Sequence, residues 1–451
     1  MKSEQQYIEL FTQCEPMICR HSADVMNAPR AEAFRHFEEL GFPSRKFEKY
    51  KYTDVSKYFA PNYGLNLNRL EMPVNPYEVF KCDVPNMSTS LYFVVNDAFD
   101  KHDNPTSPLP EGVIFGSLRD MCSQHPELVK KYYSQLADTS KDAITAFNTM
   151  FVQDGVFMYV PKNTVIDKPI QLVNILRADV DFMVNRRILV VVEEGAQAKL
   201  LVCDHAMDEV NFLSTQVVEV FVGENAFFDL YELEETHNAN IRFSNTYVRQ
   251  SANSNVQLNG VTLHNGTTRN TTEVYLEGPG AEINLNGMAI VDRNERIDNN
   301  TFIDHRATDC VSNELFKYVL DEQSVGAFAG KVLVREGSQR TTSQQTNRNI
   351  CITNDARMYT QPQLEIYADD VKCSHGATVG QLDEKALFYM QQRGISLHEA
   401  KLLLMFAFVN EVIDSIRMDA LKERLHLLVE KRFRGELNKC KKSCMACKSK
   451  K

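Results

Sequence analysis

Residues 369–376, Asp-Asp-Val-Lys-Cys-Ser-His-Gly, form the densest group of side chains able to do chemistry in this sequence. Because residues two apart share one face of a strand, Cys373 and His375 should point the same way. Thiolate and imidazole are ligands that iron and iron–sulfur clusters use, but a tetrahedral site needs four ligands. The pattern therefore predicts either half of a metal site that another chain completes, or a buried structural pair. Burial is the more common fate of a free cysteine.

A second candidate metal site lies near the C-terminus, where Cys440, Cys444 and Cys447 stand in a lysine-rich segment. Neighbouring lysines favour the thiolate form, and three thiolates so close together in the sequence could hold a metal or part of a cluster. A short, polar terminal segment is also typical of disorder, so an adventitious cluster of thiols is an equal alternative.

The remaining constellations give no candidate catalytic residue. Asp304-His305 and Cys203-Asp204-His205 have residue types used in hydrolysis. No third partner is evident for either, and coincidence explains them better. The sequence also lacks the GxxxxGK[ST] and GxGxxG nucleotide motifs. If ATP is involved, we expect another chain to supply the ATPase.

Composition excludes several classes of protein. Apolar residues make up 43% of the 451 residues and charged residues 24%, with a net charge of −10. An acidic balance of this kind disfavours nucleic acid as a partner. The longest apolar run, Leu402 to Val409, is far too short for a membrane span. No signal-like segment is evident, and the eleven cysteines are an odd number. We therefore expect free thiols and a cytoplasmic location.

A structural repeat organises the middle of the chain. Turns with a small residue recur at a near-constant spacing, at Gly195-Ala196, Asn225-Ala226, Asn253-Ser254, Gly280-Ala281, Thr308-Asp309 and Gly337-Ser338. Each interval holds two strand-like runs, which predicts a mainly β fold with a right-handed parallel β-helix core. A β-sandwich is the alternative, although it would not require so even a period. We assign residues 1–155 to an N-terminal helical and mixed α/β region, 156–380 to the β-helix, 381–437 to a C-terminal helical domain and 438–451 to a basic tail.

The C-terminal helical domain contains a candidate docking surface. Ser396-Leu-His-Glu399 is a capping box that opens a helix with apolar residues on more than one face. Packing on the chain's own β-helix would account for those faces. The sharper alternative is a protein-binding surface that includes Leu402, Phe406 and Val409.

The segment Tyr367-Ala-Asp-Asp-Val-Lys-Cys-Ser-His-Gly-Ala-Thr-Val-Gly380 resembles the signature of the SufB/SufD family of SUF iron–sulfur cluster assembly scaffolds. Residues 362–365, 345–349 and 161–170 are also similar, and the resemblance covers about residues 150 to 430. Near the N-terminus, Gly41-Phe-Pro-Ser-Arg45 and Glu48-Lys-Tyr-Lys-Tyr-Thr-Asp54 are closer to the SufD branch, although Tyr50 stands where a Trp is usual.

The resemblance implies a non-enzymatic scaffold subunit in a SufB–SufC–SufD complex. It implies pairing with a SufB-like paralogue through the β-helices, binding of a SufC-like ATPase through the C-terminal helices, and ATP used only through SufC. His375 would lie at the SufB interface, where a transient cluster or iron forms, with Cys373 beside it. The isolated chain would hold no cofactor stably and could form a homodimer, and the tail cysteines are not part of the family pattern.

Two other hypotheses stay open at this point. The chain could be the SufB paralogue itself, which retention of iron and sulfide by the isolated protein would reveal. It could instead be a β-helix enzyme acting on polysaccharides, with Asp369-Asp370 as its acid pair, although the missing export signal argues against this.

Overall fold

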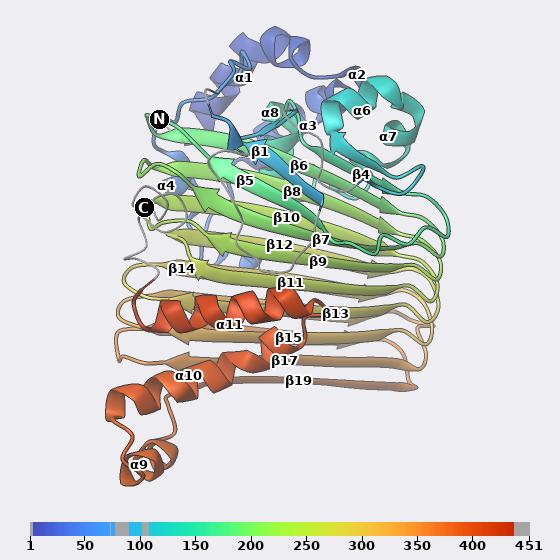
Figure 1. Ribbon diagram of the computed structural model, residues 1–451. Coiled ribbons are helices and arrows are strands. Elements are labelled where there is room, and N and C mark those ends of the chain that lie inside the picture. Colours follow the sequence, from blue (N-terminus) through green and yellow to red (C-terminus); the bar gives the residue numbers. More distant parts are fainter. Residues whose placement is uncertain (1–2, 73, 77–89, 102–107, 437–451) are drawn as a thin grey trace.

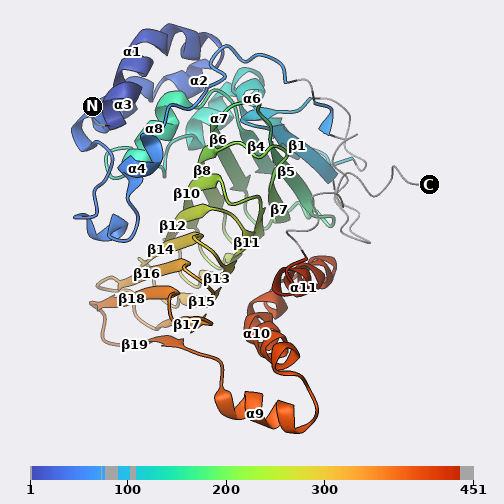
Figure 2. The ribbon, with the colours of Figure 1, turned by 90° about the vertical axis from the view of Figure 1, so that its left-hand side faces the viewer.

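The computed structural model describes residues 3–72, 74–76, 90–101 and 108–436. In this part of the chain the strands form two long sheets that face each other (Figures 1 and 2). From β4 onward, successive strands alternate between the two sheets, and each pairs in parallel with the strand two positions along the chain. This topology is a parallel β-helix, so the predicted fold is confirmed and the sandwich is excluded.

Sheet I is nine-stranded and sheet II ten-stranded in the described residues. Sheet I contains β3 (Ile114–Ser117), β4 (Val156–Val160), β6 (Phe182–Val192), β8 (Phe212–Val222), β10 (Asn240–Gln250), β12 (Thr267–Leu276), β14 (Arg296–His305), β16 (Val325–Val334) and β18 (Arg357–Ile366). Sheet II contains β1 (Ser90–Val95), β2 (Ala98–Phe99), β5 (Ile170–Leu176), β7 (Gln197–Ala206), β9 (Phe227–Glu235), β11 (Asn255–His264), β13 (Glu282–Val291), β15 (Val311–Leu320), β17 (Thr341–Cys351) and β19 (Val371–Gly380).

The repeated turns lie at the corner where the chain passes from sheet I to sheet II. Each holds a residue with a left-handed backbone, for which Gly, Asn and Asp are best suited: Gly195, Asn225, Asn253, Gly280, Asp309 and Gly337. The residue that follows is fully buried in every case, which explains why it is small: Ala196, Ala226, Ser254, Ala281, Cys310 and Ser338. The regular period of the sequence therefore reflects one steric requirement repeated at each coil.

Helices cover the outer faces of both sheets. The N-terminal half contributes α1 (Ser3–Arg20), α2 (Asp24–Asn27), α3 (Arg30–Leu40), η1 (Glu48–Tyr50), α4 (Val55–Phe59), α6 (Leu118–Gln124), α7 (Pro126–Tyr132) and α8 (Ala143–Phe151). Helices α1, α3, α4 and α8 share a core with Met183, Leu213 and Phe243 of sheet I, and α2, α6 and α7 share another with Leu189 and Phe221 of the same sheet. The C-terminal helices α9 (Glu384–Gln392), α10 (Leu397–Asp414) and α11 (Asp419–Phe433) follow β19, and α10 and α11 pack on sheet II.

The two ends of the solenoid differ. At the N-terminal end, short antiparallel strands, β2 on β1 and β3 on β4, close the sheets. At the C-terminal end, the outermost strands are β18 and β19, and no other described strand pairs with their free edges. We call these two edges, with the inward-facing side chains of β19, the open end; α9 projects past it (Figures 1 and 2).

Candidate functional site: the open end of the solenoid

Strand β19 places the two predicted ligands on its inward face. Cys373 pairs in register with Ser343 of β17, and His375 with Gln345. Ser343 and Gln345 are buried in the solenoid interior, and paired residues of parallel strands point to the same side. His375 is nevertheless exposed, because no further coil of the described chain covers this face. The prediction of a shared face is confirmed, whereas full burial of the pair is not observed.

Cys373 lies half-buried at the rim of the interior core, in contact with its apolar side chains. Burial raises the pKa of the Cys373 thiol, and a hydrogen bond from the Ser343 backbone opposes that shift. Partial burial therefore keeps the thiol protonated over a wider pH range than in water, so a ligand role would require a compensating positive charge.

The interior becomes polar as the solenoid approaches its open end. The column of inward positions that ends at Cys373 includes the apolar Val256 and Ile283 and continues with Ser312 and Ser343. The Ser312 hydroxyl donates to Ser343 Oγ over 2.8 Å. On its other side, Ser312 Oγ lies 2.9 Å from Nε2 of the buried His305. Burial lowers the pKa of His305 to about 4, so this imidazole is neutral at physiological pH.

The neighbouring column ends at His375 and changes from apolar to polar side chains at the same strand, β15. Leu258 and Leu285 are followed in register by Glu314, Gln345 and His375. The Gln345 amide donates from Nε2 to Glu314 Oε2 over 2.5 Å. Burial raises the pKa of Glu314 to about 7, because a carboxylate in the interior loses its hydration.

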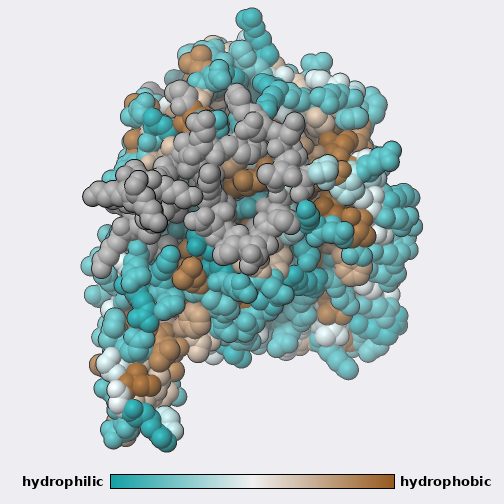
Figure 3. Space-filling model, in the orientation of Figure 1, coloured by the Kyte–Doolittle hydropathy of each residue, from teal (hydrophilic) through white to brown (hydrophobic). Residues whose placement is uncertain are grey.

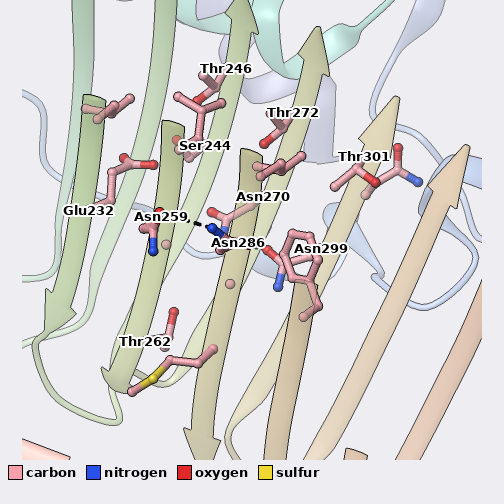
Figure 4. A pocket seen from close by; sticks show the side chains of 18 residues that line it. Glu232, Ser244, Thr246, Asn259, Thr262, Asn270, Thr272, Asn286, Asn299 and Thr301 are labelled. Carbon is pink, nitrogen blue, oxygen red and sulfur yellow. Dashed lines mark hydrogen bonds between the residues drawn. The ribbon is translucent and has the colours of Figure 1, made fainter. Parts of the chain in front are cut away.

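A small internal cavity of about 50 Å³ lies between the sheets just before these polar columns (Figure 4). Its lining includes Asn270, Asn299 and Thr301 from sheet I, and Gly260 leaves open space on the opposite wall. A hydrogen bond of 2.9 Å joins Asn270 Nδ2 to Asn299 Oδ1. The polar interior is thus continuous along sheet I beside the cavity, and the volume suits water-sized occupants only.

The donors at the open end do not complete a metal site by themselves. Across residues 3–72, 74–76, 90–101 and 108–436, no group of three or more His, Cys, Asp and Glu side chains converges on a common point. Cys373 and His375 therefore supply at most two ligands, and a tetrahedral site would need donors from elsewhere. The tail residues Cys440, Cys444 and Cys447 lie outside the described residues, so their metal binding stays a prediction.

Other sequence candidates take structural positions. Asp304 and His305 point to opposite faces of β14, and the Asp304 carboxylate receives hydrogen bonds from Arg306 and Arg335.

Asp370 lies in the turn before β19, whereas His375 stands in the middle of that strand. At the rise per residue of a strand, the two are separated by roughly 17 Å. At this separation the Asp370 carboxylate is out of hydrogen-bond reach of the His375 ring.

The predicted docking residues on α10 are mostly turned inward. Leu402, Phe406 and Val409 are spaced i, i+4 and i+7, so they share one face of the helix, and much of that face packs on sheet II. Val409 is fully buried there, so direct contact of Val409 with a partner is wrong. Leu402 and Phe406 line a groove of about 220 Å³ between α10 and α11, together with Leu403 and Phe433.

Sequence reasoning missed the two polar columns as a feature. Glu314 and Gln345 were not singled out for any role, although a signal exists in β17. Residues 341–349, Thr-Thr-Ser-Gln-Gln-Thr-Asn-Arg-Asn, contain no apolar residue on either face. A strand inside a solenoid without an apolar face can only line a polar interior or an open end.

Fold and site together define a β-solenoid protein whose candidate site opens at one end of the coil and is incomplete in the described chain. Two family models match the sequence: the SufBD protein N-terminal region over residues 1–172, and the SUF system FeS cluster assembly SufBD core domain over residues 175–408. The chain therefore belongs to the SufBD family of iron–sulfur cluster assembly proteins.

Curated relatives agree with this family. An iron–sulfur cluster assembly SufBD family protein of Synechocystis is 28% identical over 399 residues, covering 86% of this chain and 87% of that protein. The iron–sulfur cluster assembly protein SufD of Bacillus subtilis is 24% identical over 417 residues, covering 90% and 93%. SufD of Escherichia coli is 28% identical over 242 residues, covering 54% and 57%.

Proposed function

We propose that this protein is a SufD-like scaffold subunit that pairs with a SufB-like paralogue and binds a SufC-like ATPase. In this proposal the open end is the paralogue interface. His375 offers one imidazole nitrogen to iron or to a nascent cluster, and the paralogue supplies thiolates. Iron and the cluster are cargo of the complex, so the isolated chain holds neither stably.

The single observation that carries the proposal is the position of His375. It stands on the inward face of the outermost strand, yet it is accessible, and Cys373 is two residues away. Unpaired strand edges are templates for strand addition by another chain, so a partner docked on β18 and β19 would enclose His375. A second copy of this chain could use the same edges, so the proposal allows a homodimer when the paralogue is absent.

The C-terminal helices support an ATPase dock on a different surface. Helix α9 contains no buried residue, and Phe388 is 63% exposed. Leu403 of α10 is 44% exposed at the groove between α10 and α11. Figure 3 shows hydrophobic side chains on this projecting part of the molecule. These accessible positions replace Val409 in the proposed contact with the ATPase.

A non-catalytic role is consistent with family membership and with the sequence. ATP would act only through the partner ATPase, because this chain lacks a P-loop motif. None of the described helices combines the length and apolar character needed to cross a bilayer. The cytoplasmic location stays a prediction, since two relatives, both from Arabidopsis thaliana, are named as chloroplastic.

Co-expression with the paralogue and the ATPase from the same host tests the proposal. We expect the three chains to co-elute on gel filtration and the purified complex to contain iron and acid-labile sulfide. His375→Ala should leave the assembly and its ATPase activity intact but lower both contents, and Cys373→Ser should do less harm. Failure of the three chains to co-elute would reject the partnership, and normal cluster content in an intact His375→Ala complex would reject the ligand role.

A further inference from the structure

We propose that Gln345, oriented by Glu314, positions the His375 imidazole so that one chosen ring nitrogen faces the cargo. The inference rests on the proposed function, in which His375 is the donor. Neither Gln345 nor Glu314 would touch the cargo, so both are positioning residues.

The orientation of the Gln345 amide follows from its neighbour. In the structure the amide turns Nε2 toward Glu314 and donates to its Oε2, and an ionised Glu314 carboxylate, which only accepts hydrogen bonds, requires this orientation. Because Nε2 of Gln345 bonds to Glu314 in the preceding coil, Oε1 remains available to a side chain of the following coil. Gln345 is 1% exposed, and its Oε1 has no hydrogen-bond partner among the described residues. A buried acceptor without a partner is costly, so this oxygen is available to a donor.

The residue in the following coil is His375, which pairs in register with Gln345 on the same face. Neighbouring strands lie about 4.8 Å apart, a span that an amide oxygen and an imidazole N–H can bridge. When Gln345 accepts that N–H, the ring is held in one neutral tautomer and its other nitrogen keeps the lone pair a metal needs. In the structure Oε1 of Gln345 has no partner, so the His375 ring has to turn toward the interior to make this bond, and the bond would then fix its tautomer.

The opposite wall of the solenoid is shaped to admit Gln345. Gly330 of β16 lies across the interior, and a Cβ there would overlap with Nε2 of Gln345. Its backbone is not in the left-handed region, so a turn does not explain this glycine. The space for the Gln345 amide does explain it. Gly260 is a control position for Gly330, because a Cβ at Gly260 would contact no atom within 4 Å.

Imidazole ¹⁵N shifts of His375 test the inference on the isolated full chain, with the signals assigned by their loss in His375→Ala. In mildly alkaline buffer, the wild type should show one dominant neutral tautomer. Gln345→Leu should move both ring shifts toward a mixture of tautomers, and Gly330→Ala should do the same because its Cβ displaces the amide. Gly260→Ala should leave the shifts unchanged.

A charge-swapped variant guards against simple misfolding. In Glu314→Gln/Gln345→Glu, the new amide donates to the new carboxylate, which still accepts the His375 N–H, so the wild-type shifts should return. In the three-chain complex, Gln345→Leu should weaken retention of ferrous iron by about tenfold or more, as loss of an outer-shell partner typically does.

The outcomes separate the two proposals. Identical His375 shifts in wild type and Gln345→Leu, or equal effects of Gly330→Ala and Gly260→Ala, would overturn the positioning role. Altered shifts with normal iron in an intact complex would uphold the positioning role and reject His375 as the cargo ligand.

Discussion

The buried Glu314 carboxyl should make the free energy of unfolding depend on pH. Its side chain is buried inside the solenoid, 2% exposed, and burial raises its pKa from 4.5 to about 7. A carboxyl whose pKa is raised on folding favours the native state while it is protonated. That contribution is fully present below the unfolded value of 4.5 and is lost as the pH rises through about 7.

The magnitude follows from the shift. A difference of about 2.5 pKa units is worth about 3 kcal/mol, at about 1.4 kcal/mol per unit. Gln resembles the protonated carboxyl in shape and charge, so Glu314→Gln should keep the native contacts and avoid the cost of an ionised group. We expect the variant and the wild type to be equally stable near pH ~4 and the variant to be more stable by about 3 kcal/mol near pH ~8.

Urea unfolding followed by circular dichroism at a series of pH values measures this difference; tyrosine fluorescence is a second probe, since the chain has no Trp. Subtracting the two curves cancels other buried groups, such as Glu234, whose pKa burial raises to about 7, and His305. Glu224→Gln, in an exposed turn, is the matched control. A stability difference that stays constant with pH, or a variant that is less stable than the wild type in alkaline buffer, would refute the reasoning.

Three further outcomes are expected. His375→Ala should lower the melting temperature only slightly, because the side chain is exposed, and a large drop in a thermal scan would mean that it supports the fold. Arg432→Met should cost about 3–5 kcal/mol in urea, since the buried guanidinium bonds to Leu263 O and to two acidic side chains. Arg434→Met, in the turn after the same helix, removes only exposed ion pairs with Glu399 and Glu430 and should cost at most about 1 kcal/mol. Leu403→Asp should weaken binding of the ATPase in a titration without shifting the melting temperature, and unchanged affinity would exclude the groove from the dock.

Local chemistry explains why much of the fold could be predicted. A left-handed corner favours Gly, Asn or Asp wherever it occurs. The spacing of residues such as Gly195 and Asn225 therefore reveals the period of the solenoid in the sequence. The Ser396 cap is equally local, and its hydroxyl accepts from the Glu399 amide as expected. Helix α3 spans Arg30–Leu40 and is followed by Gly41 at a positive φ, a helix end that depends only on the local Gly-Phe-Pro sequence.

Features that depend on packing were not predictable in this way. Helix α8, Ala143–Phe151, is buried on all sides, and a short apolar run of this kind cannot be assigned to helix or strand by its period. Helix α10 is apolar on more than one face, so the sequence could not tell which face sheet II would cover. Val409, which the sequence offered as part of a docking surface, is buried.

The sequence by itself determined the β-solenoid, the SufBD family signature and the shared face of Cys373 and His375, because strand alternation and turn sterics act between near neighbours. Only the tertiary structure decided that His375 is accessible. An inward side chain is buried when another coil follows and exposed when none does, and no local pattern records which coil is outermost. The structure alone also aligned Glu314, Gln345 and His375, since residues so far apart in the chain meet only when successive coils stack in register.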